Sequence, residues 1–378
     1  MSLFSKAFQT ELRVVRKDRW LFALVFWLSP VLSLFMLLIF SAGQPTNLSV
    51  GVVDLDQSSL SRKVERYLEA SPALNVTRHY SSIAEGKADI SDAGIYALVV
   101  IPANLSRDMM RGEAPSISTF FNAQYLLIAK AIRSALIQIE ITLAVELDVG
   151  RTLVKTPVIK AALAKSMPVR SQISALYNLN MNYATFLVPA LLAALFQLLV
   201  ICVTILSLGR RSKQSDSQRP EGTGIRLASR SFLYTCVFSI HILVALAFLY
   251  GVLGWPHQLS LGGLLPLVIL FVIACQLLGA FFYVLTFDLV RSLSLAGAFS
   301  APAFAFLGVT FPASDMTVFA QFWRDLMPAA HYLNGFLNQV SYAAGAAHSL
   351  KPGLLMLAFT ILIPVIIFRI KDQQAGAE

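Results

Sequence analysis

Residues 20–41 read WLFALVFWLSPVLSLFMLLIFS, a stretch without a single charged side chain. About 20 consecutive apolar residues are enough for an α-helix to cross the hydrocarbon core of a bilayer. Trp20 and Trp27 belong to the residue type that anchors such a helix at the membrane–water boundary. No small-residue cleavage motif follows a short apolar core, so the stretch predicts a retained first transmembrane helix and not a signal peptide.

The rest of the chain repeats this pattern only towards its C-terminal half. Further apolar runs of spanning length cover residues 184–208, 232–254, 263–286, 293–312 and 353–370. Hydrophobic residues make up 56% of the 378 residues and charged residues 13%, whereas soluble proteins carry about 25% charged residues. The sequence therefore predicts a mainly α-helical integral membrane protein with six transmembrane helices, the first at 20–41 and five within 183–370.

Basic residues predict the orientation of these helices. With the N-terminus inside, 14 basic residues fall on cytoplasmic segments and only Arg324 and Lys351 on short outer loops. Cytoplasmic loops of membrane proteins carry such an excess of Lys and Arg. Residues 1–19 and 371–378 are therefore expected in the cytoplasm. The net charge of +9 is explained by topology, which removes the argument for a nucleic-acid partner.

The long segment at 42–182 has the pattern of an inserted α/β domain on the outer side of the membrane. Strand-like runs at 48–54, 74–80, 95–102 and 116–123 alternate with helix-like runs at 58–70, 82–91 and 103–112, and a long helix follows from about 125 to 164. Alternating strands and helices favour a small sheet with helices packed on it. The cysteines, Cys202, Cys236 and Cys275, lie in apolar runs, so the domain must be stable without a disulfide.

The inserted domain offers no convincing catalytic or metal site. Asp54 and Asp56 follow the first strand and are expected to form a turn and cap the next helix, and Asp92 has no clearer role. His79 has no His, Glu or Cys at a metal-ligand spacing and is expected on the surface.

If the chain is a transporter, its energy source must lie on another protein. No GxxxxGK[ST] motif occurs, since Gly86-Lys87 is followed by Ala88. Ion-driven transporters usually carry ionisable residues within their spans. Here His241 is the exception in the spans, and Asp288 and Arg291 fall in a short turn. A separate ATPase subunit is therefore favoured, and a membrane-embedded enzyme, which would need clustered His, Asp or Glu, is not.

Several passages resemble the ABC-2 type transporter permeases, in particular the Gram-negative exporters with a large periplasmic domain. The similar passages are VGVVDLDQSSLSRKVERYLEASPALNV (50–76), ALVVIPANLSRDMMRGEAPSISTFFNA (97–123), LYNLNMNYATFLVPALLAALFQLL (176–199) and FPASDMTVFAQFWRDLMPAAHYLNGF (311–336). The resemblance implies a type V exporter-like fold in the inner membrane of a bacterium, with residues 42–182 in the periplasm. It also implies a dimer with itself or a paralogue. It further implies cytoplasmic ABC ATPase subunits that bind ATP and Mg²⁺, a periplasmic adaptor, and no cofactor on this chain.

The resemblance assigns coupling with the ATPase to two segments. In the loop at 209–230, Glu221, Gly222 and Thr223 keep the family core, although SKQSDSQRP (212–220) replaces the usual acidic stretch. Residues 1–19 form an amphipathic pattern that lies in the membrane interface, where the family holds the ATPase. Alternatively, this segment only anchors the N-terminus on the cytoplasmic side, and the residues favour neither interpretation.

The cargo pathway is predicted where the second and fifth spans of two protomers face one another. Phe196, Gln197, Phe304 and Phe306 place aromatic faces near mid-membrane, although ordinary packing explains them equally well. Residues 313–350 are too interrupted for a span and are expected to form an outer re-entrant loop with the family motif Pro328, His331 and Tyr332. A lining of Phe, Leu, Ala and Val suits hydrophobic or amphipathic cargo, drug-like or lipid-like.

The leading hypothesis is thus the permease subunit of an ATP-driven exporter. A membrane-anchored receptor or assembly scaffold, whose outer domain binds a ligand or partner, is the alternative. Five closely spaced C-terminal spans argue against it, because a single span is enough for an anchor.

Overall fold

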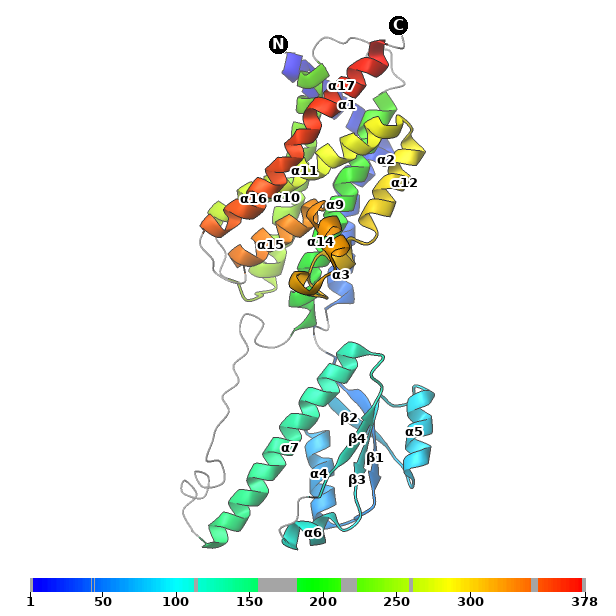
Figure 1. Cartoon of the computed structure of the whole chain (residues 1–378), viewed down its shortest axis with the longest axis vertical. Coiled ribbons are helices and arrows are strands. Elements are labelled where there is room, and N and C mark those ends of the chain that lie inside the picture. Colours follow the sequence, from blue (N-terminus) through cyan, green and yellow to red (C-terminus); the bar gives the residue numbers. More distant parts are fainter. Residues whose placement is uncertain are drawn as a thin grey trace. The chain divides into compact units, whose positions relative to one another are not determined.

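A computed structural model describes residues 3–41, 43, 45–111, 115–155, 182–211, 223–257, 261–340 and 346–375 (Figure 1). The chain divides into two compact units, one formed by Met1–Gly43 with Ala175–Glu378 and the other by Gln44–Ser174. The first is a helical unit and the second is the inserted α/β domain.

The helical unit contains the predicted spans. Within the described ranges, six helices are long and apolar enough to cross a membrane: Arg19–Ile39, Tyr183–Arg210, Thr223–Val252, Gly263–Thr286, Leu289–Phe306 and Ala347–Ala375. The mainly helical fold with six candidate spans and an inserted sheet is as predicted.

The first span follows an amphipathic helix and is irregular. Helix α1 (Leu3–Lys17) ends at Asp18, whose Oδ1 accepts hydrogen bonds from the backbone N–H groups of Trp20 and Leu21, 3.1 Å each, and so caps α2 (Arg19–Phe22). A π-helical segment at Ala23–Leu28 then leads into α3 (Ser29–Ile39). Pro30, at the start of α3, has no N–H to donate to the preceding turn, which accounts for this break in regular α-helix.

Helices α9 (Tyr183–Arg211) and α11 (Leu261–Thr286) form the centre of this unit, and α11 also packs against α10 (Thr223–Ala247), α12 (Leu289–Ser300) and α17 (Leu362–Ala375). Gly279 allows the close approach of α9, because a Cβ at this position would lie 2.8 Å from the Ile201 carbonyl oxygen. Small residues serve this purpose at helix interfaces in membranes.

Two spans differ in extent from the prediction. Helix α10 begins at Thr223, nine residues before the predicted start at 232, because its polar first turns pack against α1 instead of facing lipid. The fifth span begins at Leu289, where Asp288 Oδ1 accepts from the Arg291 N–H at 2.8 Å, and it is interrupted at Ala301–Pro302 before α13 (Ala303–Phe306).

Between the fifth and sixth spans, the chain forms short helices and no further helix long enough to cross a membrane in the described residues. They are α14 (Val318–Asp325) and α15 (Pro328–Val340), followed by α16 (Leu350–Leu357), which opens the last span. Helix α15 is largely buried and packs against α9 and α11. Figure 1 shows α1 and the C-terminal end of α17 at the same end of the helical unit, as an even number of crossings requires.

The inserted domain is a four-stranded sheet with helices on both faces. Strands β1 (Leu48–Asp54), β2 (Leu74–His79), β3 (Ala97–Ile101) and β4 (Ser118–Phe121) are arranged in the order β2-β1-β3-β4. Strand β1 runs parallel to β2 and β3, whereas β4 is antiparallel to β3. Helices α4 (Ser59–Glu69), α6 (Leu105–Arg111) and α7 (Leu126–Lys155) cover one face, and α5 (Ile83–Ser91) covers the other (Figure 1).

The acidic residues of this domain have structural roles. Asp54 Oδ1 accepts from the N–H groups of Asp56 and Gln57 at 2.9 and 3.0 Å and so closes the predicted turn. The cap of α4 is Ser58, not an aspartate, and Asp56 instead accepts from the Ser106 N–H at 3.2 Å, in the first turn of α6.

Two further polar contacts join elements of the domain. The Tyr80 hydroxyl and, at 2.6 Å, the Arg78 guanidinium both donate to Asp89, and these bonds lower the pKa of that carboxyl. His79 is exposed as predicted, but its Nε2 lies 3.5 Å from Glu65 Oε1 on α4.

Candidate functional site

Helix α1 packs against the first half of α10. The rings of Phe4 and Phe8 lie 6.0 and 6.2 Å from the ring of Phe232, and the Ser229 hydroxyl donates to the Phe4 carbonyl oxygen at 3.1 Å. Val15 is buried on the same side of the helix. The apolar face of α1 is therefore used largely for packing within the protein.

A buried carboxylate lies in the middle of this contact. Glu11 is 1% exposed. Its Oε1 accepts hydrogen bonds from the Tyr234 hydroxyl at 2.7 Å and from the Ser207 hydroxyl at 2.9 Å. Its Oε2 lies 3.5 Å from Arg230 Nε. This network of Glu11, Ser207, Arg230 and Tyr234 is called the Glu11 network below, and it joins α1 with α9 and α10.

The Glu11 network was not predicted, although the sequence contains a signal for it. Phe4, Phe8, Glu11 and Val15 recur at the spacing of one helix face, so the helical period places a carboxylate in the centre of an apolar strip. A carboxylate can be buried there only with hydrogen-bonding or charged partners.

Further polar contacts lie near the end of α9 and at the start of α10. Asp18, which follows α1, forms an ion pair with Arg210 near the end of α9. Thr223, the first residue of α10, donates through its hydroxyl to Gln374 Oε1 on α17 at 3.3 Å. Of the three predicted coupling residues, Thr223 is thus buried at this end of the unit, whereas Glu221 and Gly222 lie outside the described residues.

The predicted pathway residues separate into two groups. Phe196 and Gln197 on α9 are 2% and 0% exposed, whereas Phe304 and Phe306 on α13 are half-buried. Gln197 Oε1 accepts from the Ala329 N–H at 2.9 Å, and its Nε2 has no hydrogen-bond partner among the described residues. Gln197 therefore holds the first turn of α15, a role that its apolar neighbours in the sequence did not suggest.

The predicted outer-loop motif lies on the same helix. Pro328 opens α15, where a missing N–H is tolerated. His331 Nε2 donates to the Asp325 carbonyl oxygen at 2.8 Å, and the ring of Tyr332 stacks on Phe271 of α11 with 4.6 Å between centroids. All three side chains are buried, so the motif fixes α15 against the centre of the helical unit.

The Glu11 network is a set of structural polar contacts between helices. Across the described ranges, no three His, Cys, Asp or Glu side chains come together as a metal site requires. The Glu11 network joins α1, α9 and α10 through one set of buried polar contacts.

Comparison with known proteins identifies a family of membrane proteins. The model of the ABC-2 family transporter protein family matches residues 19–370. Searches of curated proteins and of solved structures gave no match. Because the family model covers nearly the whole chain, with five candidate spans in full and most of the sixth, the chain belongs to the ABC-2 family of transporter proteins.

Proposed function

We propose that this chain is the permease subunit of an ATP-driven exporter for hydrophobic or amphipathic compounds, drug-like or lipid-like. Membership of the ABC-2 family makes it a transport subunit with an ABC ATPase subunit as partner. In this proposal the ATPase binds ATP and Mg²⁺ in the cytoplasm, two permease protomers form the pathway, and a periplasmic adaptor receives cargo at the inserted domain. Phe304 and Phe306, half-buried in one protomer, are available to face the second one.

The Glu11 network carries the coupling part of this proposal. A buried carboxylate is stable only in a narrow geometry, because losing a partner leaves an uncompensated charge or polar group away from water. A movement of the loop or of α1 therefore shifts α9, α10 and α1 together. We propose that an ATPase bound at this end of the unit uses this connection to move the spans.

Orientation is a second part of the proposal. With α1 and the end of α17 in the cytoplasm, the inserted domain lies in the periplasm and the spans lie in the inner membrane. The Glu11 network then lies at the cytoplasmic end, within reach of an ATPase.

Cysteine labelling tests this orientation. In a variant without native cysteines, Ser81→Cys, which is exposed in the inserted domain, is expected to react with an impermeant maleimide on intact spheroplasts. Gln373→Cys, exposed near the end of α17, is the matched control and is expected to react only after lysis. The opposite pattern of reaction would place the inserted domain in the cytoplasm and reject the orientation.

Transport into inside-out vesicles tests the function itself. Vesicles with the permease and its ATPase subunit are expected to accumulate an amphipathic fluorescent dye only with ATP and Mg²⁺. A variant of the ATPase that cannot hydrolyse ATP serves as the control and should reduce uptake to that of empty vesicles. Uptake that is identical with and without hydrolysis would favour the receptor or scaffold alternative.

A further inference from the structure

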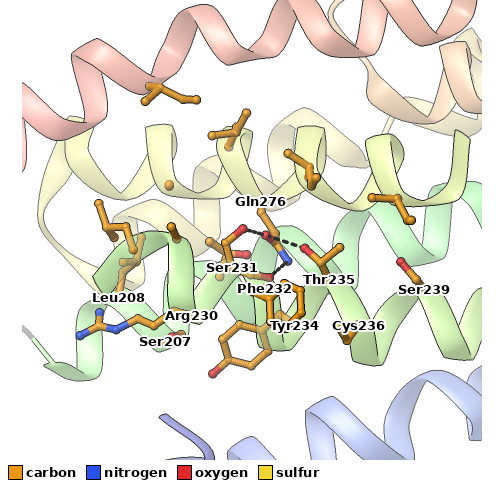
Figure 2. A pocket seen from close by; sticks show the side chains of 18 of the residues that line it. Ser207, Leu208, Arg230, Ser231, Phe232, Tyr234, Thr235, Cys236, Ser239 and Gln276 are labelled. Atoms are coloured by element: carbon orange, nitrogen blue, oxygen red, sulfur yellow. Dashed lines mark hydrogen bonds between the residues drawn. The ribbon is translucent and has the colours of Figure 1, made fainter. Parts of the chain in front are cut away.

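A large cavity opens beside α10. It has a volume of about 670 Å³ and is lined by α10, α11, α17 and the end of α9. This volume lies within the range of about 300–1,000 Å³ that is typical of small-molecule sites. Three members of the Glu11 network, Ser207, Arg230 and Tyr234, also line the cavity (Figure 2), so the cavity adjoins the network.

The cavity walls are mostly apolar, and their polar side chains include a row of hydroxyl groups on α10. Ser231, Thr235 and Ser239 follow one another at intervals of four residues on α10, which places them on one face over about 12 Å. Gln276 of α11 accepts from Ser231 and, at 3.4 Å, from Thr235, and its Nε2 donates to the Ser231 carbonyl oxygen at 3.2 Å (Figure 2).

Ser239 differs from the other two hydroxyl residues. It is 6% exposed and lines the cavity, but its Oγ has no hydrogen-bond partner among the described residues. Its oxygen points towards α11, on the side of α10 that also carries the contacts with Gln276 (Figure 2). Helical serines commonly donate to the carbonyl four residues earlier, as Ser294 does to Val290 at 2.9 Å. A buried hydroxyl without a partner is unfavourable. The missing hydrogen-bond partner of Ser239 therefore indicates a group that is absent from the chain itself.

The charges around the cavity limit what can bind. Arg230 is the one charged residue that lines it in the described part of the chain, and its guanidinium belongs to the Glu11 network. The remaining polar side chains near the row are uncharged. An ion in the cavity would be removed from water without a counter-charge, which is strongly unfavourable.

We propose that this cavity binds an uncharged amphipathic small molecule, with an apolar body against α11 and α17 and a carbonyl or hydroxyl group hydrogen-bonded to Ser239. The Ser239 oxygen is covered by neighbouring side chains, so binding includes a rotamer change of these apolar residues. A hydrocarbon tail is a poorer occupant, because it leaves the hydroxyl without a partner. The proposal extends beyond ATP-driven export, since it concerns binding by the permease alone.

Cys236 provides a direct test because it is exposed and lines the cavity. In the full chain with Cys202→Ser and Cys275→Ala, reconstituted in nanodiscs without ATP, alkylation of Cys236 by N-ethylmaleimide is followed over time. Progesterone is the probe, as an uncharged flat molecule with a carbonyl group at each end. We expect it to slow alkylation several-fold in a saturable manner.

The hydroxyl at position 239 is tested by its removal. Ser239→Ala is expected to weaken protection by progesterone about five- to tenfold, the effect of one lost hydrogen bond. Its Tm should be unchanged or higher, because the substitution removes an unpaired buried oxygen. Ser294→Ala, which changes a helical serine outside the cavity, is the control. In this variant progesterone should protect Cys236 as well as it does in the parent.

Several outcomes of the Cys236 alkylation assay would overturn the proposal. Equal protection by 5α-pregnane, which lacks the carbonyls, would show a non-specific apolar surface. Stronger protection by dioleoylglycerol would identify a site for membrane lipid. The proposal would also be rejected if no probe slowed the alkylation of Cys236. The same holds if progesterone protected Cys236 equally in Ser239→Ala and in its parent. None of these results depends on whether the chain exports cargo.

Discussion

Glu11→Ala is expected to destabilise the helical unit by about 3–5 kcal/mol, the usual effect of removing one partner from a buried charged pair. The substitution leaves Tyr234 and Ser207 without their acceptor and Arg230 without its carboxylate. Glu11→Gln keeps the size of the side chain and an acceptor oxygen, so it should remain inserted and folded. It removes the charge that faces Arg230, and ATP-driven uptake of the dye should fall at least tenfold.

A matched control and a double-mutant cycle make this prediction specific. Glu69→Gln, the same change at an exposed position in α4, should leave both the Tm and transport unchanged. Combining Glu11→Ala with Tyr234→Phe, each of which removes their shared hydrogen bond, should give a non-additive change in the free energy of unfolding of about 0.5–3 kcal/mol, as expected for residues in one hydrogen-bond network. Additive effects of the two substitutions would contradict the proposed network.

Gln197→Leu is the second substitution with a large expected effect. It leaves the buried N–H of Ala329 without an acceptor, which destabilises by about 1–3 kcal/mol. Because α15 carries the Pro328, His331 and Tyr332 motif, the Tm and transport should fall together for every cargo. Thermal unfolding of the purified chain and the vesicle assay measure the two effects.

A comparison of Gln197→Leu with Phe304→Ala distinguishes an effect on stability from an effect on cargo binding. Phe304→Ala, at a half-buried position of α13, should change the preference among cargoes with a smaller fall in Tm. Gln138→Leu, at an exposed position of α7, is the control for the glutamine substitution and should have no effect. An unchanged Tm with altered cargo preference for Gln197→Leu would instead place Gln197 in the pathway.

The sequence was sufficient for the architecture because both units have strong periodic signals. Apolar runs of spanning length predict the candidate spans, and β-branched runs between turn residues predict the strands β1 to β4. Their boundaries were less predictable. Hydropathy could not detect that α10 begins at Thr223, because the polar residues of its first turns are stabilised by contacts with α1, a segment distant in sequence.

The sites were harder to predict than the fold, for a related reason. Glu11, Ser207, Arg230 and Tyr234 come from three segments, and only the packing of α1 against α9 and α10 brings them together. Ser239 is an ordinary serine in an apolar run, and the cavity beside it has the same composition as a lipid-facing surface. Coupling through Glu221 and Gly222 stays a prediction, because both lie outside the described residues.

Cargo-stimulated ATP hydrolysis by the purified complex of permease and ATPase tests the central claim, coupling through the Glu11 network, most directly. The wild-type complex should hydrolyse ATP faster when an amphipathic cargo is added. The Glu11→Gln complex should assemble and keep its basal hydrolysis but lose this stimulation. Stimulation of the Glu11→Gln complex to the wild-type rate would contradict the account, because α1 and its buried carboxylate would then have no part in coupling.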